Sequence, residues 1–190
     1  DKVRLILPIP ADKPCGMLSR REDMPFIISY YGDLTLPNNY NGLRWFCNTV
    51  LPELSGYSVE LHVAGKGSEQ FSVYDRVRAF GFVDNIDAFV CSAQIVVAPI
   101  FSGAGLKIKV LDAIGYGKPM ITTPKGAEGF PLWLKNQLHI ASSTEEFVQL
   151  LSSMIVSYHD FAKTAEGLQK EVSTRMGQTQ FQRQLLRDIQ

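Results

Sequence analysis

The chain has 190 residues, 45% hydrophobic and 20% charged, which is the balance of an ordinary globular protein and excludes a disordered or fibrous one. This length allows one domain with a complete core. Nineteen basic and 19 acidic residues give a formal net charge of zero, so nucleic-acid binding has no electrostatic support. The longest apolar runs fall far short of the ~20 residues that cross a bilayer, and we expect no transmembrane segment and no signal peptide.

The three cysteines, Cys15, Cys47 and Cys91, are odd in number and lack CxxC spacing. This pattern indicates neither a disulfide framework nor a zinc site. We therefore expect reduced thiols, with Cys47 and Cys91 as small core residues. The sequence also lacks a DxD-type acidic cluster, so we expect no metal ion.

Three parts follow one another along the chain. Residues 1–25 form a linker-like segment, in which a β-like run at 3–7 precedes three prolines within seven residues. Residues 26–175 form the domain, and residues 176–190 are predicted to be a polar C-terminal helix. Within the domain, β-like runs alternate with helical patterns. The runs are 26–31, 59–64, 77–80, 95–98, 120–122 and 138–141, and the helices are 43–51, 86–90, 105–116, 144–158 and 161–175.

This alternation predicts an α/β fold, a Rossmann-like doubly wound parallel sheet of about six strands with helices on both faces. Glycine turns follow most of the strands, and the carboxyl ends of parallel strands share one edge of a sheet. Ligands of such sheets bind at that edge, where the strand order reverses. No GxGxxG follows the first strand, which counts against an ordinary NAD-binding domain.

One strand, turn, helix and strand unit, at 95–125, carries the strongest site pattern. Its turn, Gly103-Ala104-Gly105, lets the backbone approach a ligand closely, and the N-terminus of the following helix suits a phosphate. Helical spacing places Gly105, Lys109, Asp112 and Tyr116 on one face. A lysine and a carboxylate there suit a phosphate and a pair of sugar hydroxyls. The competing interpretation is a solvated Lys–Asp pair on an amphipathic helix.

Several stretches together resemble a known family. They are YYGDLTLPNNYNGLRWF, VELHVAGKG, VRAFGFVDNIDAFVCSAQIVVAPIFSGAGLKIKVLDAIGYGKPMITTPKGAEGF and the EEFVQLL helix. In this order they resemble the C-terminal, donor-binding half of retaining glycosyltransferases with two facing Rossmann-like domains (GT-B fold, group 1, family 4-like). The resemblance covers nearly all of the chain from about Phe26 onward.

The resemblance implies a site for a nucleoside diphosphate sugar. The donor diphosphate would be bound by the backbone of the turn and by nearby lysines, the ribose by an acid in the following helix, and the nucleobase by the turn after the third strand. The residues at these positions are Gly103, Ala104, Gly105 and Leu106; Lys109, with Lys66 and Lys107 as further cations; Asp112; and Gly81, Phe82 and Val83. The resemblance assigns no catalytic residue and no cofactor or metal.

The chain departs from the family's pattern in three respects. The commonest pattern has Glu at both ends of an eight-residue step, where this sequence has Ala104 and Asp112. A basic residue that often follows the first strand is replaced by Asp33. No stretch resembles the N-terminal domain that binds the acceptor. We expect an excised donor domain, with a partner half on a separate chain as the alternative, and in either case a chain that is inactive alone.

The resemblance further implies the partners and the location. The complete enzyme would transfer a sugar, with retention, to a glycan or lipid-linked acceptor in polysaccharide or lipopolysaccharide synthesis. It would be cytoplasmic, with a peripheral location at the inner face of the membrane as an alternative. Two other functions stay open: half of a sugar-nucleotide epimerase, which shares the architecture, or a non-catalytic scaffold domain of the same fold.

Overall fold

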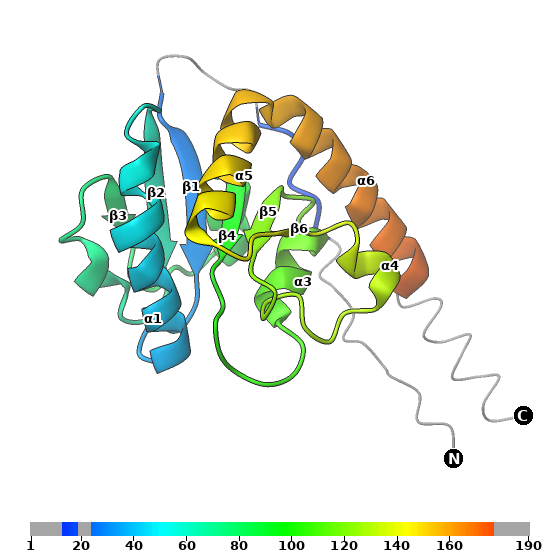
Figure 1. Ribbon diagram of the computed structural model, residues 1–190, viewed down its shortest axis with the longest axis horizontal. Coiled ribbons are helices and arrows are strands. Elements are labelled where there is room, and N and C mark those ends of the chain that lie inside the picture. The colour runs from blue at the N-terminus through cyan, green and yellow to red at the C-terminus, as the bar shows by residue number, and fades with distance from the viewer. Residues whose placement is uncertain (1–12, 19–23, 177–190) are drawn as a thin grey trace, which may run out of the picture.

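The computed structural model describes residues 13–18 and 24–176. These residues form one parallel sheet in the order β3-β2-β1-β4-β5-β6 (Figure 1). The strands are β1 (Phe26–Tyr31), β2 (Val59–Ala64), β3 (Val77–Ala79), β4 (Ile95–Ala98), β5 (Met120–Thr122) and β6 (His139–Ile140). The predicted fold is confirmed. The order reverses between β1 and β4, which makes their carboxyl ends the switch point at which such sheets bind ligands.

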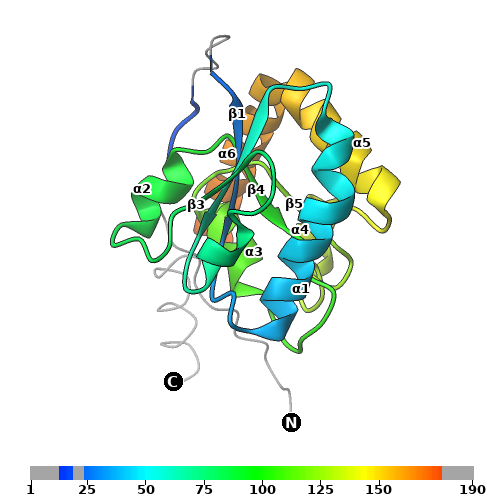
Figure 2. The ribbon, with the colours of Figure 1, turned by 90° about the vertical axis from the view of Figure 1, so that its left-hand side faces the viewer.

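The helices cover both faces of this sheet. They are α1 (Pro37–Trp45), which continues as a wider turn over Phe46–Val50, α2 (Ile86–Cys91), α3 (Ile108–Gly115), α4 (Leu132–Lys135), α5 (Thr144–Val156) and α6 (Tyr158–Met176). In Figure 2, α1 and α5 lie on one side of the strands, and α2 and α3 lie on the other. The long α6 packs on both α3 and α5.

Each central strand serves two cores, one on each face of the sheet. In β4, Ile95 and Val97 belong to the core under α1 and α5, whereas Val96 and Ala98 belong to the core under α2 and α3. Successive side chains of a strand point to opposite faces, so a strand covered on both sides needs an unbroken apolar run. This explains why the sequence of β4 is continuous Ile, Val, Val and Ala.

The first helix begins six residues earlier than the sequence predicts. Pro37 occupies the first turn of α1, where its missing N–H costs nothing. Gly42 brings α1 against the end of β4, because a Cβ at this position would collide with the carbonyl oxygen of Pro99. The polar run before Leu43 is therefore the beginning of the helix and lies beside the switch point.

The expectation of reduced thiols was wrong for two of the three cysteines. Cys15 and Cys91 form a disulfide, whereas Cys47 is free and buried, as expected. Backbone hydrogen bonds align residues 13–15 with the end of α3: Lys13 N–H donates to Gly115 and Cys15 N–H to Tyr116. This alignment brings Cys15 to the last residue of α2, although 76 positions separate the two cysteines in sequence.

Two predicted elements, the β-like run at 3–7 and the C-terminal helix beyond residue 176, lie outside the described residues. In the part that the structure describes, no helix is both long enough and apolar enough to cross a membrane.

Candidate functional site

The end of β1, the start of α1 and the first turn of α3 meet at the switch point. A Cβ built on Gly32, directly after β1, would lie 3.2 Å from Nζ of Lys109 and 3.6 Å from Nδ2 of Asn39. One built on Gly103 would lie 3.5 Å from Nδ2 of Asn38. Three segments far apart in sequence therefore surround one position at the carboxyl edge of the sheet.

The predicted phosphate turn is a loop between β4 and α3. Residues 103–105 are exposed, and Gly103 and Gly105 have φ angles of 101° and 71°. These angles favour glycine. The buried Lys107 amine donates hydrogen bonds to the carbonyls of Gly103, at 3.2 Å, and Gly105, at 2.7 Å. Lys107 thus holds the shape of the turn from inside.

The helix after the turn starts later than predicted. It begins at Ile108, so Gly105 lies in the loop and does not share a helix face with Lys109, Asp112 and Tyr116. The half-buried Leu106 anchors the loop, because its side chain packs over Gly129 in the β5–α4 connection. A Cβ built on Gly129 would lie 3.6 Å from this side chain.

The amine of Lys109 is buried and, among the described residues, has no hydrogen-bond partner. It lies 3.6 Å from the centre of the Tyr30 ring. Burial lowers the pKa of Lys109 to about 7. An unpaired buried cation is costly, so this site suits a ligand that brings negative charge and hydrogen-bond acceptors.

Asp112 lies one turn further along α3 and is half-buried. Burial raises the pKa of its carboxyl, and the nearby Lys13 acts in the opposite direction. Burial raises the pKa of Tyr31, and the Asp112 carboxyl raises it further. Burial also raises the pKa of Tyr116, with further contributions from Asp87 and then Asp112. Tyr31 donates a hydrogen bond to the carbonyl of Lys109, which ties the end of β1 to this face of α3.

The predicted nucleobase turn follows β3. Gly81 has a φ angle of 66°, and hydrogen bonds hold it between Ser68 and Gly65. Phe82 is 80% exposed, whereas Val83 packs against the core under α2 and α3. An exposed ring on a backbone fixed in this way offers a stacking surface.

Lys66 follows β2 and is exposed. Hydrogen bonds from Thr35 lower the pKa of Asp33, and Lys66 lowers it further. Lys66 therefore stands near the acid that follows β1 and supplies a positive charge at the β1 side of the site.

Three neighbours of the site were missed in the sequence. Asn38 and Asn39 form part of the first turn of α1, but their sequence context is typical of a turn. Lys13 stands outside any periodic pattern, and no local signal places it near Asp112.

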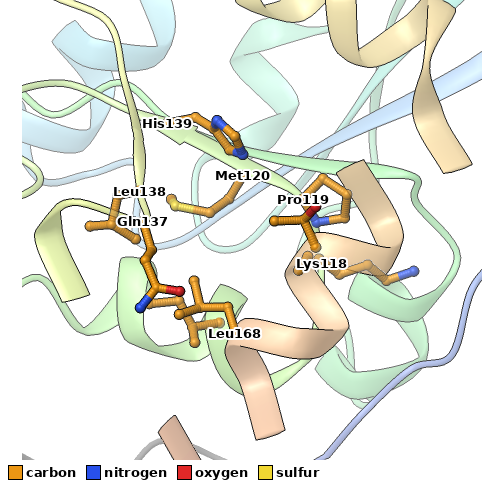
Figure 3. A pocket seen from close by; sticks show the side chains of 10 residues that line it. Lys118, Pro119, Met120, Gln137, Leu138, His139 and Leu168 are labelled. Carbon is orange, nitrogen blue, oxygen red and sulfur yellow. The ribbon is translucent and has the colours of Figure 1, made fainter. Parts of the chain in front are cut away.

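Two cavities lie away from the predicted donor residues. The larger, ≈ 340 Å³, is lined by Trp45, Phe101, Thr123, Pro124, Lys125, Ala141, Ser142, Ser143 and Thr144. Trp45 packs edge-on against Phe101, with the ring centres 4.8 Å apart. The smaller cavity is near Met120, His139 and Leu168 and encloses ≈ 20 Å³, room for little more than a water molecule (Figure 3).

Within residues 13–18 and 24–176, His, Cys, Asp and Glu side chains form no group of three or more that would hold a metal ion.

The family model for glycosyl transferases group 1 matches residues 25–156. The chain belongs to this family. A curated relative, an uncharacterized 44.6 kDa protein in the cps region of Klebsiella pneumoniae, is 29% identical over 137 residues, 64% of this chain and 35% of the relative.

Several solved structures share the fold. The crystal structure of Anabaena Alr3699/HepE in complex with UDP has a TM-score of 0.69 at 14% identity and covers 87% of this chain and 48% of that one. TarM has a TM-score of 0.68 at 10% identity, over 90% of this chain and 36% of its own. The C-terminal domain of the group 1 family protein LpcC from Francisella tularensis has a TM-score of 0.58 at 16% identity, over 80% of this chain and 87% of that domain.

The chain thus spans 35% of the Klebsiella relative and 48% of the Anabaena protein. It matches the greater part of a structure that is itself a C-terminal domain.

Proposed function

We propose that this chain is the donor-binding domain of a retaining glycosyltransferase and binds a nucleoside diphosphate sugar at the carboxyl edge of the sheet, between β1 and β4. The observation that carries the proposal is the buried, unpartnered amine of Lys109 beside Gly32 at the switch point. Among the described residues this amine lacks the acceptor that a phosphate oxygen would supply.

In this proposal the diphosphate lies along residues 103–106. Backbone N–H groups of the turn and the positive end of the α3 dipole face it, and Lys109 supplies a full charge. When the bond to the sugar breaks, negative charge grows on the leaving diphosphate, and fixed donors stabilise that charge. The proposal assigns this task to the chain itself and not to a metal ion.

The nucleoside lies between α3 and the turn after β3. The Asp112 carboxylate accepts hydrogen bonds from the ribose hydroxyls, and the exposed ring of Phe82 stacks on the base. Lys66 adds positive charge on the β1 side, where Asp33 stands in place of a basic residue.

The comparisons support this assignment at the level of family and fold. The Anabaena structures are described as complexes with UDP and with UDP-glucose, and a TarM structure as a complex that includes UDP. The Klebsiella relative is described as a protein in the cps region, which supports a role in polysaccharide or lipopolysaccharide synthesis.

The proposal also covers the whole protein. A second, N-terminal domain would bind the glycan or lipid-linked acceptor, so this chain alone should bind donor without transferring sugar. We place the enzyme in the cytoplasm, peripheral to the inner face of the membrane when the acceptor is lipid-linked.

Calorimetric titration with UDP, GDP and their sugars tests the donor site. We expect one nucleotide series to bind and Asp112→Asn to weaken its binding by about tenfold or more, since a hydrogen bond to a charged group is worth about 1.5–3 kcal/mol. Asp75→Asn is the matched control, because the Asp75 side chain is 97% exposed and precedes β3, at the opposite edge of the sheet.

Two results would contradict the proposal. Equal affinities in the Asp112→Asn and Asp75→Asn variants would remove the ribose assignment, and no binding by any nucleotide would remove the donor site. Sugar transfer by this chain alone would refute the proposal that a second domain is needed to bind the acceptor.

A further inference from the structure

Residues 13–18 lie across two helices: α3, which carries Asp112, and α2, which follows the proposed base turn. In Figure 2 this dark blue segment runs beside α2. On the α3 side, Lys13 and Cys15 N–H groups donate to the carbonyls of Gly115, at 3.3 Å, and Tyr116, at 3.0 Å. On the α2 side, Cys15 is covalently bonded to Cys91.

Side chains complete the bridge between the helices. The amine of Lys13 lies 2.6 Å from Oδ2 of Asp87, in the first turn of α2. The hydroxyl of Tyr116, directly after α3, donates to Oδ1 of the same carboxylate at 2.7 Å. One acid on α2 thus binds both the segment and the end of α3.

The bridged helices carry the two halves of the proposed nucleoside site. The base turn, residues 81–83, leads into α2, and the ribose acid Asp112 belongs to α3. Lys13 also acts electrostatically on Asp112 and favours its charged form. A charged carboxylate is the form that accepts hydrogen bonds from both ribose hydroxyls.

We propose that residues 13–18 form a clamp, closed by the Cys15–Cys91 disulfide, that fixes α2 against α3 and holds Lys13 at the end of α3, the helix that carries Asp112, so that the oxidised chain binds the nucleotide more tightly than the reduced chain. The proposal rests on the donor site assigned above. Lys13 acts here as a positioning residue.

Reduction opens the clamp by ordinary thiol chemistry. A dithiol breaks the S–S bond, Cys15 and Cys91 each become a thiol, and the dithiol is oxidised to its own disulfide. Disulfides are rare in reducing compartments and are often redox-sensing where they occur there. The donor affinity of this domain would then follow the redox state around it.

The effect should be moderate, because α2 has a second attachment to the end of α3. Lys118 donates hydrogen bonds from its buried amine to the carbonyls of Cys91, at 3.2 Å, and Ala93, at 2.8 Å. We therefore expect reduction to loosen α2 without unfolding the domain.

The first experiment counts thiols and measures affinity. The denatured oxidised chain should be alkylated at Cys47 alone and the reduced chain at all three cysteines. The donor nucleotide should bind about two- to fivefold more weakly to the reduced chain, the effect expected from one partly exposed ion pair and a looser helix. Cys15→Ser/Cys91→Ser is the control, since its affinity should match the reduced chain and should not respond to a dithiol.

The second experiment needs no nucleotide. Amide hydrogen exchange in α2 should be faster in the reduced chain and in the Cys15→Ser/Cys91→Ser variant, while the centre of β4 exchanges as before. Lys13→Met in the oxidised chain should lower the affinity about twofold or more and raise the pKa of the Asp112 carboxyl followed by NMR. Lys163→Met, at an exposed position on α6, should change neither.

These measurements separate the two proposals. If nucleotide binds equally well to both redox forms and α2 exchange does not change, the clamp is refuted and the donor site stands. If α2 exchange responds to reduction but no form binds a nucleotide, the donor site is refuted, and with it the effect of the clamp on affinity. Three reactive thiols in the untreated denatured chain would overturn the clamp outright.

Discussion

The amine of Lys109 lies 3.6 Å from the centre of the Tyr30 ring, in a buried position where no described group accepts a hydrogen bond from it. The ring face offers weak electrostatic attraction but no acceptor. The charge on this amine therefore has opposite effects on stability and on binding. The free folded domain is more stable when the amine is neutral, whereas a diphosphate is bound more tightly when it is charged.

The stability of the domain should depend on pH through Lys109. Its pKa is about 7 in the folded chain, against an ordinary lysine value of 10.5. Between these values the unfolded chain binds more protons, so stability should rise with pH, at a limiting slope of about 1.4 kcal/mol per unit. Lys109→Met should lack this contribution and be more stable at pH 7 by about 1–3 kcal/mol. Urea unfolding of both proteins from pH 6 to 9 measures the difference.

The contributions of other titratable groups to the pH dependence of stability cancel when the two proteins are compared. Burial also lowers the pKa of Lys118, to about 8, but Lys118 is present in both proteins. Parallel pH profiles for the two proteins would show that the Lys109 amine is not buried as described.

Donor binding should be coupled to proton uptake. At pH 8 most of the Lys109 amine is neutral in the free domain, and a bound diphosphate raises its pKa again. Titration of the nucleotide in two buffers of different ionisation enthalpy should reveal uptake of up to about one proton. Lys109→Met should bind more weakly and take up none. Identical uptake by both proteins would assign the proton to another group.

The ring of Phe82 should contribute to binding without contributing to stability. It is 80% exposed, so Phe82→Ala should change the free energy of unfolding by less than about 0.5 kcal/mol. Loss of stacking on a base should weaken nucleotide binding by about five- to fiftyfold, or about 1–2.3 kcal/mol. Val73→Ala is the matched control, at 83% exposure and outside the site. Equal affinities in the two variants would place the base elsewhere.

Two helical glycines should respond oppositely to alanine. At Gly42 on α1, a Cβ would meet the carbonyl of Pro99, so Gly42→Ala should destabilise the domain by about 1–3 kcal/mol. At Gly167 on α6, a Cβ has open space within 4 Å, so Gly167→Ala should stabilise it by about 0.5–1 kcal/mol. Thermal unfolding of both variants is the measurement, and a stable Gly42→Ala would mean that α1 does not lie against β4.

The strands could be predicted because the burial of each strand determines the pattern of apolar residues in its own sequence. Covered on both faces, β1 and β4 have continuous apolar runs, and β2 has the alternation of a partly covered strand. The start of α1 could not be predicted in the same way. Its first residues are Pro37, Asn38 and Asn39, which are typical of turns, and tertiary contact with β4 makes them helical.

In the candidate site, too, some parts could be predicted from local sequence and others could not. The glycine turn and the helix that carries Lys109 and Asp112 follow from a pattern of about 20 residues, and the structure brings them to one edge of the sheet. The disulfide and the position of Lys13 depend on a segment without periodicity that crosses the ends of two helices. No local pattern encodes a contact of this kind between distant segments.

The packing of Trp45 has a practical consequence. Its indole touches Phe101, two residues before the glycine turn, and also Phe147 on α5. The chain has one other tryptophan, Trp133, under the guanidinium of Arg175. With Trp133→Phe, the intrinsic fluorescence would come from Trp45 alone. A rearrangement of the loop around an arriving donor would then change the emission, and the domain would serve as its own optical sensor.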